Sequence, residues 1–177
     1  MDKNESLNRA INEKVVIAPY DESWPAMFEK ERYELLNMFR ESLVAVEHFG
    51  STAVAGLSAK PIIDIMAGVV SMAQADELLE PLCRVGYTTS DEFNASLVDR
   101  RWLMRHSNGR RTHHLHLMVY KSEAWIRHLE FRDKLRASKQ LAREYESKKK
   151  KWASEYVFDR EEYTNSKSIF IENTLTI

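Results

Sequence analysis

Residues 47–66 constrain the fold more than any other stretch, because they predict a strand, a tight glycine turn, a short helix and a second strand in quick succession. The valine-rich run 43–49 is typical of a strand that is covered on both faces. Gly50 then lets the backbone turn sharply, and Ser51 can cap a short helix that Gly56 closes. Such a corner points unpaired amide donors outward, so it is suited to an anion.

The second strand of this stretch, residues 62–70, carries one charge, Asp64. A carboxylate buried in an apolar strand costs several kcal/mol unless it is hydrogen-bonded, paired or bound to a metal. Two interpretations therefore remain open at this point. Asp64 either caps the neighbouring turn or is a functional group.

The spacing of apolar residues predicts the remaining elements. Ser23, Ser71 and Ser122 can each act as the N-cap of a helix, and two further helices follow the third. Residues 97–106 and 112–120 are expected to pair as an antiparallel hairpin. The other expectations are helices over 24–39, 72–86, 123–136, 141–156 and after 159, a short strand at 15–17, a polar connection at 88–95, and a frayed or weakly helical start at 1–14.

The second strand of the expected hairpin carries a pair of histidines. Strand alternation places His114 and His116 on one face and His113 on the other. Together with Asp64, the pair would form a metal site of two histidines and one carboxylate. Imidazoles that only hydrogen-bond within a polar cleft are the more common outcome, and this alternative stays open. Arginine on such strands suits bidentate binding of phosphate or carboxylate, and five arginines lie nearby: Arg100, Arg101, Arg105, Arg110 and Arg111.

Length, charge and cysteine content narrow the class of protein. A chain of 177 residues suits a single domain over 1–177, with a sheet core at about 15–120 and a helical portion at about 121–177. Its formal net charge is -1, and the lysine run 148–151 is typical of a solvated face, so we expect neither nucleic acid nor a membrane as partner. The single cysteine, Cys83, fits a reducing compartment, and with no apparent leader peptide it favours a cytoplasmic location.

Several motifs together resemble those of the GrpB family, and the resemblance extends from Val15 to about Ile171. The resemblance implies an α/β (α+β) fold similar to that of the nucleotidyltransferase superfamily with the polymerase-beta-like fold: a mixed β-sheet flanked by helices, with a C-terminal helical portion. The family also occurs fused to dephospho-coenzyme A kinases in some bacteria. The motifs are Pro19-Tyr20 with Trp24-Pro25, the runs 48–54, 56–57, 60–64 and 112–116, Phe131-Arg132-Asp133 to Leu135-Arg136, and Tyr163, Lys167 and Phe170.

The resemblance also implies roles for individual residues. Gly50 and Ser51 match the pair that holds nucleotide phosphates, and Asp64 matches the first of two acids that hold a divalent metal. Met66 stands at the position of the second acid, and a thioether cannot replace an acidic oxygen ligand for a hard cation. The remaining expectations are His114 and His116 as substitute ligands for Mg²⁺ or Mn²⁺, and Thr52, Lys60, Arg101, Arg132 and Lys167 as further phosphate-binding residues.

Two hypotheses about function follow from the resemblance. The first is nucleotidyl transfer, or binding of a nucleotide or another phosphorylated small molecule, in a cleft between the sheet and the C-terminal helices, with Asp64 as the catalytic residue. The second is a ligand-binding or chaperone-like module without catalysis, related to coenzyme A metabolism. Metal dependence of ligand binding distinguishes the two.

Overall fold

The computed structural model describes residues 15–176, so the expectation for residues 1–14 lies outside the described chain. Within it, five strands form one mixed sheet in the order β1-β2-β5-β4-β3. The central strands β2 and β5 run parallel, and the other neighbours are antiparallel. The strands are β1 (Ala45–Phe49), β2 (Ile63–Val69), β3 (Tyr87–Thr89), β4 (Arg100–Ser107) and β5 (Arg110–Val119).

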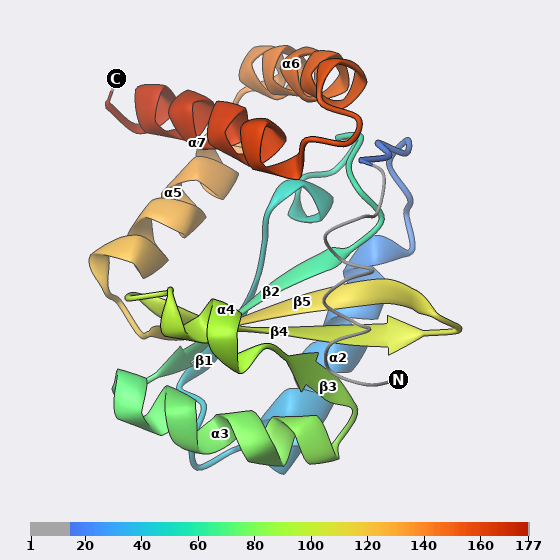
Figure 1. The fold of residues 1–177 in the computed structure, drawn as a ribbon. Helices are drawn as coiled ribbons and strands as arrows, with labels where there is room; N and C mark the ends of the chain where they lie inside the picture. Colours follow the sequence, from blue (N-terminus) through green and yellow to red (C-terminus); the bar gives the residue numbers. More distant parts are fainter. Residues whose placement is uncertain (1–14, 177) are drawn as a thin grey trace.

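Helices cover both faces of the sheet (Figure 1). The helices α2 (Trp24–Met38) and α3 (Met72–Arg84) pack on one face. On the other side, α5 (Glu123–Ala137), α6 (Lys139–Glu155) and α7 (Arg160–Thr176) contact one another and form a helical layer. Two short elements complete the described fold: the 3₁₀-helix η1 (Ser51–Ala53) and α4 (Asp91–Ala95).

Strand alternation divides the side chains of β2 and β5 between these two layers. The main core lies between the sheet and the helices α2 and α3, where Ile63, Ile65 and Leu115 are buried. Met66 and Met118 face the other way and pack with Phe49 and Trp125 beneath α5. Asp64 shares the face of Met66, and His114 and His116 share the face of Met118, because each pair is separated by an even number of positions along its strand. All three side chains therefore project toward the helical layer.

Most of the expected elements are present. The hairpin of β4 and β5 is confirmed, as is the position of Asp64 on β2. Ser71 and Ser122 are N-caps, since their hydroxyls accept hydrogen bonds from the backbone N–H groups of residues 74 and 125. The mixed α/β architecture with a C-terminal helical portion agrees with the sequence prediction.

Other expectations were wrong in their local detail. Residues 15–17 form no strand, and the chain there makes one isolated bridge between Ala18 and Ala59. The expected polar connection at 88–95 contains β3 and α4 instead. Ser23 precedes α2 without a side-chain cap. Ser51 lies inside η1, and Gly50 is its N-cap residue, so Ser51 does not cap this turn through its hydroxyl.

No helix within residues 15–176 combines the length and the apolar character needed to cross a membrane.

Candidate metal and anion site

Asp64, His114 and His116 come together on the face of the sheet that looks toward the helical layer. The parallel register of β2 and β5 sets Asp64 opposite His114 and Met66 opposite His116. The Nδ1 of His114 lies 3.1 Å from Oδ1 of Asp64. One potential ligand atom from each of the three residues lies within 4.8 Å of the others, so the geometry is close to that of a metal site.

The polar contacts of His114 define its tautomer. Arg111 approaches the Nε2 of His114 at 3.4 Å, and a guanidinium can only donate hydrogen bonds. Nε2 therefore accepts, and Nδ1 carries the proton that is donated to Asp64. Burial by itself would raise the pKa of Asp64, but the hydrogen bond from His114 and the nearby positive charge of Lys167 lower it overall. Asp64 is thus an ionised carboxylate at neutral pH.

His116 provides the strongest test of whether the site fits a metal ion. Its Nδ1 is shielded from solvent and has no hydrogen-bond partner among the described residues. Burial, followed by the nearby charge of Arg100, lowers the pKa of His116 well below its usual value, so the ring is a neutral imidazole. A neutral imidazole with a free nitrogen beside an ionised carboxylate is a competent metal ligand. The three residues therefore fit a divalent cation, provided that the proton of His114 moves from Nδ1 to Nε2 on binding and the contact of Nε2 with Arg111 is given up.

Gly50 closes the site on one side and must be glycine for two reasons. Its backbone has φ 72° and ψ -171°, a region that is nearly restricted to glycine. A Cβ added at Gly50 would also lie 2.6 Å from Oδ2 of Asp64. The turn after β1 thus packs its backbone directly against the carboxylate, and it limits where Asp64 can point.

A small cavity of about 120 Å³ lies beside Asp64 and His114. Three lysines line it, Lys60, Lys149 and Lys167, so the cavity carries more positive than negative charge. The ammonium groups of Lys60 and Lys167 lie 5.2 and 5.5 Å from the centre of the Tyr163 ring. The remaining lining residues are Ser51, Thr52, Ala59, Ile62 and Thr164. A cavity of this size and charge suits one phosphate group.

Lys149 is a site residue that the sequence analysis missed. Its side chain is only 1% exposed, and its Nζ donates a hydrogen bond to the carbonyl oxygen of Ser58. Burial, followed by the charge of Lys167, lowers the pKa of Lys149 to about 7. The helical stripe of α6 contains the signal, because Tyr145, Lys149 and Trp152 are spaced by four and three residues. The run 148–151 was expected to form a solvated face, and the buried Lys149 departs from that expectation.

The structure groups only some of the expected phosphate-binding residues around Asp64. Ser51, Thr52, Lys60 and Lys167 line the small cavity, and the backbone of Gly50 lies against the carboxylate. The hydroxyl of Thr52 is already engaged at 3.0 Å from Nε2 of His48.

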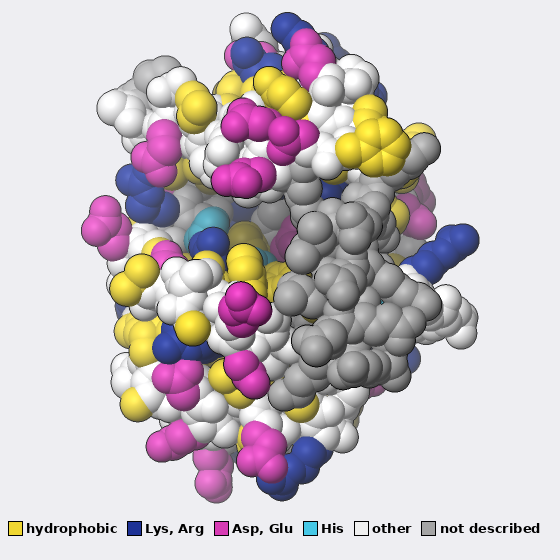
Figure 2. All heavy atoms as spheres, viewed as in Figure 1, with side chains coloured by type: hydrophobic (Ala, Val, Ile, Leu, Met, Phe, Trp, Pro, Cys, Tyr) yellow, Lys and Arg dark blue, Asp and Glu magenta, His cyan; other side chains and the backbone are white. Residues whose placement is uncertain are grey.

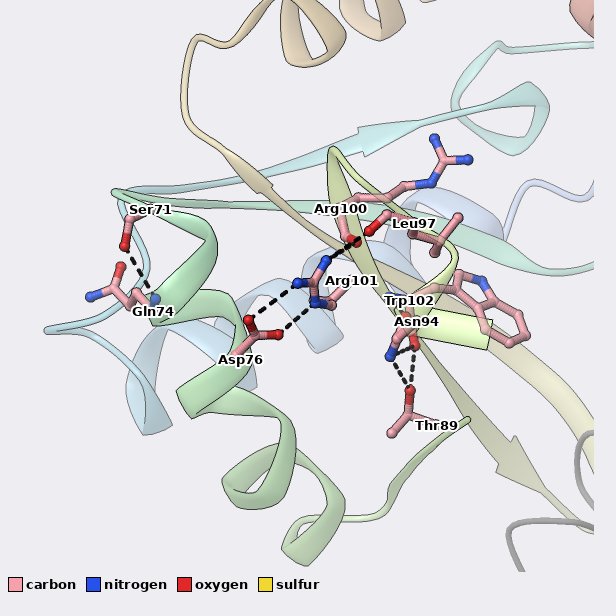
Figure 3. A network of polar contacts seen from close by, with 9 residues as sticks. All are labelled: Ser71, Gln74, Asp76, Thr89, Asn94, Leu97, Arg100, Arg101 and Trp102. Atoms are coloured by element: carbon pink, nitrogen blue, oxygen red, sulfur yellow. Dashed lines mark hydrogen bonds and ion pairs between the residues drawn. The ribbon is translucent and has the colours of Figure 1, made fainter. Parts of the chain in front are cut away.

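Arg101 and Arg132 lie elsewhere. Arg101 is opposite Leu117 in the sheet, so it projects to the α3 side, where it pairs with Asp76. Figure 3 shows this pair and shows Arg100, one residue earlier, pointing the other way. Arg132 bonds Glu47 and the carbonyl oxygen of His48. It lines a separate groove of about 870 Å³ along β1.

Met66 does not reach the site. Its side chain is fully buried in the apolar cluster of Phe49, Met118 and Trp125. Since Met66 pairs with His116, the imidazole of His116 stands beside the position where a second acid would be. The donor set is therefore one carboxylate and two imidazoles.

Fold and site together define a mixed α/β protein with a candidate metal and anion site between the sheet and a C-terminal helical layer. The family model for the GrpB protein matches residues 14–176. This chain belongs to the GrpB family.

Two relatives extend over nearly the whole chain. The chain is 35% identical to the glutamate-rich protein GrpB of Alkalihalophilus pseudofirmus over 170 residues, which covers 92% of this chain and 94% of that protein. The crystal structure of the conserved protein GrpB from Enterococcus faecalis matches with a TM-score of 0.75 and 31% identity. That match covers 90% of this chain and 99% of the other.

A third match is partial. The chain is 35% identical over 98 residues to the dephospho-CoA kinase of Mycolicibacterium paratuberculosis. The match covers 54% of this chain and 24% of the kinase.

Proposed function

We propose that this GrpB-family chain binds a phosphorylated small molecule, more specifically a nucleotide. We further propose that it assists transfer of the phosphoryl or nucleotidyl group of this ligand with a divalent metal. The observation that carries this proposal is the cluster of Asp64, His114 and His116 beside the lysine-lined cavity. A divalent ion bound there would polarise a phosphoryl oxygen and neutralise charge that develops during transfer.

The residues around that ion would have different roles. Lys60, Lys149 and Lys167 would bind the non-reacting phosphate oxygens, because all three line a cavity of phosphate size. Asp64 stays ionised and supplies the anionic ligand. Gly50 keeps the carboxylate from rotating toward β1.

The donor set favours Mn²⁺ over Mg²⁺. Magnesium requires oxygen ligands in near-ideal octahedral geometry, whereas imidazole nitrogens suit transition metals such as iron and zinc, the series in which manganese is the weakest binder. A site with one carboxylate oxygen and two ring nitrogens is poor for Mg²⁺ unless the ligand's phosphate supplies further oxygens. We therefore expect Mn²⁺ to bind the chain alone and Mg²⁺ to bind only together with a phosphorylated ligand.

Thermal denaturation tests the proposal. The chain is heated with Mn²⁺ or Mg²⁺, with and without nucleoside triphosphates, and a ligand that binds only the folded state raises Tm. Asp64→Asn should abolish the stabilisation by Mn²⁺ and any transfer activity while the protein stays folded. Asp76→Asn is the matched control, because Asp76 pairs with Arg101 on the far side of the sheet. Unchanged metal-dependent stabilisation in Asp64→Asn would refute the assignment.

A second candidate function is a ligand-binding module without catalysis that acts in coenzyme A metabolism. The observations that favour it are the partial match to a dephospho-CoA kinase and the burial of Met66 at the position of a second acid. The same denaturation series distinguishes it. Stabilisation by phosphorylated coenzyme A precursors without any metal supports the module, and metal-dependent stabilisation by a nucleotide supports the enzyme.

A further inference from the structure

A second cavity, of about 650 Å³, opens on the same side of the sheet between the start of β4, the first half of α5, and α7. Its size is within the range of small-molecule sites. Figure 2 shows the molecule hollowed between the helical layer and the segment around α4, with histidine and Lys or Arg side chains inside the hollow. None of the residues to which the proposed function gives a role lines this cavity.

Arg100 is one of two arginines that line this cavity. It pairs with Met118 across the sheet, so it projects to the same face as His116. Figure 3 shows its guanidinium extending away from Arg101 and from the α3 side. Within residues 15–176, the Arg100 side chain has no hydrogen-bond or ion-pair partner. An unpaired guanidinium lining a cavity is a ready site for a carboxylate, which it can bind with two parallel hydrogen bonds.

His128 of α5 lies next to Arg100. Its ring is 5.1 Å from Phe49, and the Phe49 ring is 5.1 Å from His116, so the inner end of the cavity adjoins the candidate metal site. Burial, followed by the charge of Arg100, lowers the pKa of His128 to about 4. His128 is thus a neutral imidazole that can share in binding an anion without adding charge.

The rim of the cavity has the opposite sign. Asp99 and Glu123 are exposed carboxylates on its lining. Two further charged residues line the cavity, Arg127 and Glu172. They form an ion pair with each other, so their charges cancel. Apolar side chains also line the cavity: Val119, Ala124, Ile171 and Leu175.

We propose that this cavity binds a small amino-carboxylate zwitterion, with its carboxylate on Arg100, its aliphatic part on the apolar wall, and its ammonium group at the Asp99 and Glu123 rim. A simple anion would be repelled by the rim, and a simple amine would leave the arginine unpaired. A molecule with both charges matches both ends of the cavity. This ligand is a second one, beyond the phosphorylated molecule of the proposed function.

The test uses the whole chain without metal or nucleotide, so that its outcome is separate from that of the metal site. The ¹⁵N-labelled protein is titrated with ω-amino carboxylates of increasing length, including 6-aminohexanoate, and with hexanoate and hexylamine as single-charge probes. Arg100→Gln is compared with Arg101→Gln, the adjacent arginine on the opposite face. Asp99→Asn tests the acidic rim.

We expect saturable shifts at the amides of Ser122, His128 and Ser168 with an amino carboxylate, and weaker binding of both single-charge probes. Arg100→Gln should raise the Kd about tenfold or more, since a charge-assisted contact is lost. Asp99→Asn should raise it about two- to fivefold for the zwitterion and leave the Kd of hexanoate no higher.

Each contrary result overturns the proposal. Equal affinity in Arg100→Gln would show that the arginine does not hold the carboxylate. Hexylamine or hexanoate binding as tightly as the zwitterion would show that one end of the cavity is not used. The absence of saturable binding by every probe in the folded wild-type chain would show that the cavity is not a site for this class.

Discussion

Replacing Gly50 by alanine tests the packing of the β1 turn against Asp64. The backbone there, with φ 72° and ψ -171°, costs a non-glycine residue about 1–3 kcal/mol. For a domain of this size that corresponds to a fall in Tm of roughly 3–10 °C. Gly50→Ala should therefore stay folded at room temperature with reduced stability.

The second effect of Gly50→Ala concerns the metal site. The new Cβ would lie 2.6 Å from Oδ2 of Asp64, and the carboxylate must move by about 0.8 Å to reach ordinary van der Waals separation. Metal–ligand distances tolerate only about 0.2 Å, so we expect Mn²⁺ affinity to fall at least about tenfold.

Gly56→Ala is the matched control for this prediction. Gly56 also has positive φ, 79°, but nothing lies within 4 Å of an added Cβ. Its variant should lose stability through the backbone alone and bind Mn²⁺ as the wild type does. Electron paramagnetic resonance of unbound Mn²⁺ measures both affinities. Wild-type affinity in folded Gly50→Ala would refute the inference that this turn holds Asp64 in place.

Three further predictions concern stability. The pKa of Lys149 is about 7 in the folded chain and about 10.5 in the unfolded chain, so between these pH values the unfolded chain binds one more proton. The free energy of unfolding of the wild type should therefore rise by up to about 4 kcal/mol relative to that of Lys149→Met as the pH increases from 7 to 10.5, measured by urea denaturation at each pH. Glu31→Gln should lower the free energy of unfolding by about 3 kcal/mol, because the buried Glu31 pairs with Arg105 on the α3 side of the sheet. It should leave Mn²⁺ binding unchanged, and a loss of Mn²⁺ binding would contradict the separation of the two faces. Arg101→Gln should lower the free energy of unfolding by at most about 1 kcal/mol, because its partner Asp76 is half exposed. A larger decrease, measured by urea denaturation, would contradict the inference that this ion pair is a surface contact.

The sequence predicted well those features that depend on local periodicity. Alternation along 112–120 correctly placed His114 and His116 on one face and His113 on the other, because a strand has only two faces. The hairpin and the caps at Ser71 and Ser122 follow from turn and capping chemistry within a few residues.

The features that depend on register or on distant partners could not be predicted in this way. The contact between His114 and Asp64 requires β5 to pair with β2, 50 residues away, and periodicity alone does not specify that order. Arg101 was wrongly expected at the site. Its face of the sheet is set by the pairing of β4 with β5, which the sequence pattern does not specify. Lys149 was missed because both Lys148 and Lys149 fit the spacing of the α6 stripe, and only packing of α6 against Ser58 selects one of them.

Asp64, His114 and His116 are proposed to bind one divalent metal between them. Crystals soaked with Mn²⁺ and a nonhydrolysable nucleotide, with anomalous diffraction recorded at the manganese edge, test it most directly. We expect a single strong peak within bonding distance of all three side chains, with a phosphate group of the nucleotide at Lys60, Lys149 and Lys167. A folded, nucleotide-bound chain with no peak between these three residues, or with manganese bound elsewhere, would contradict it.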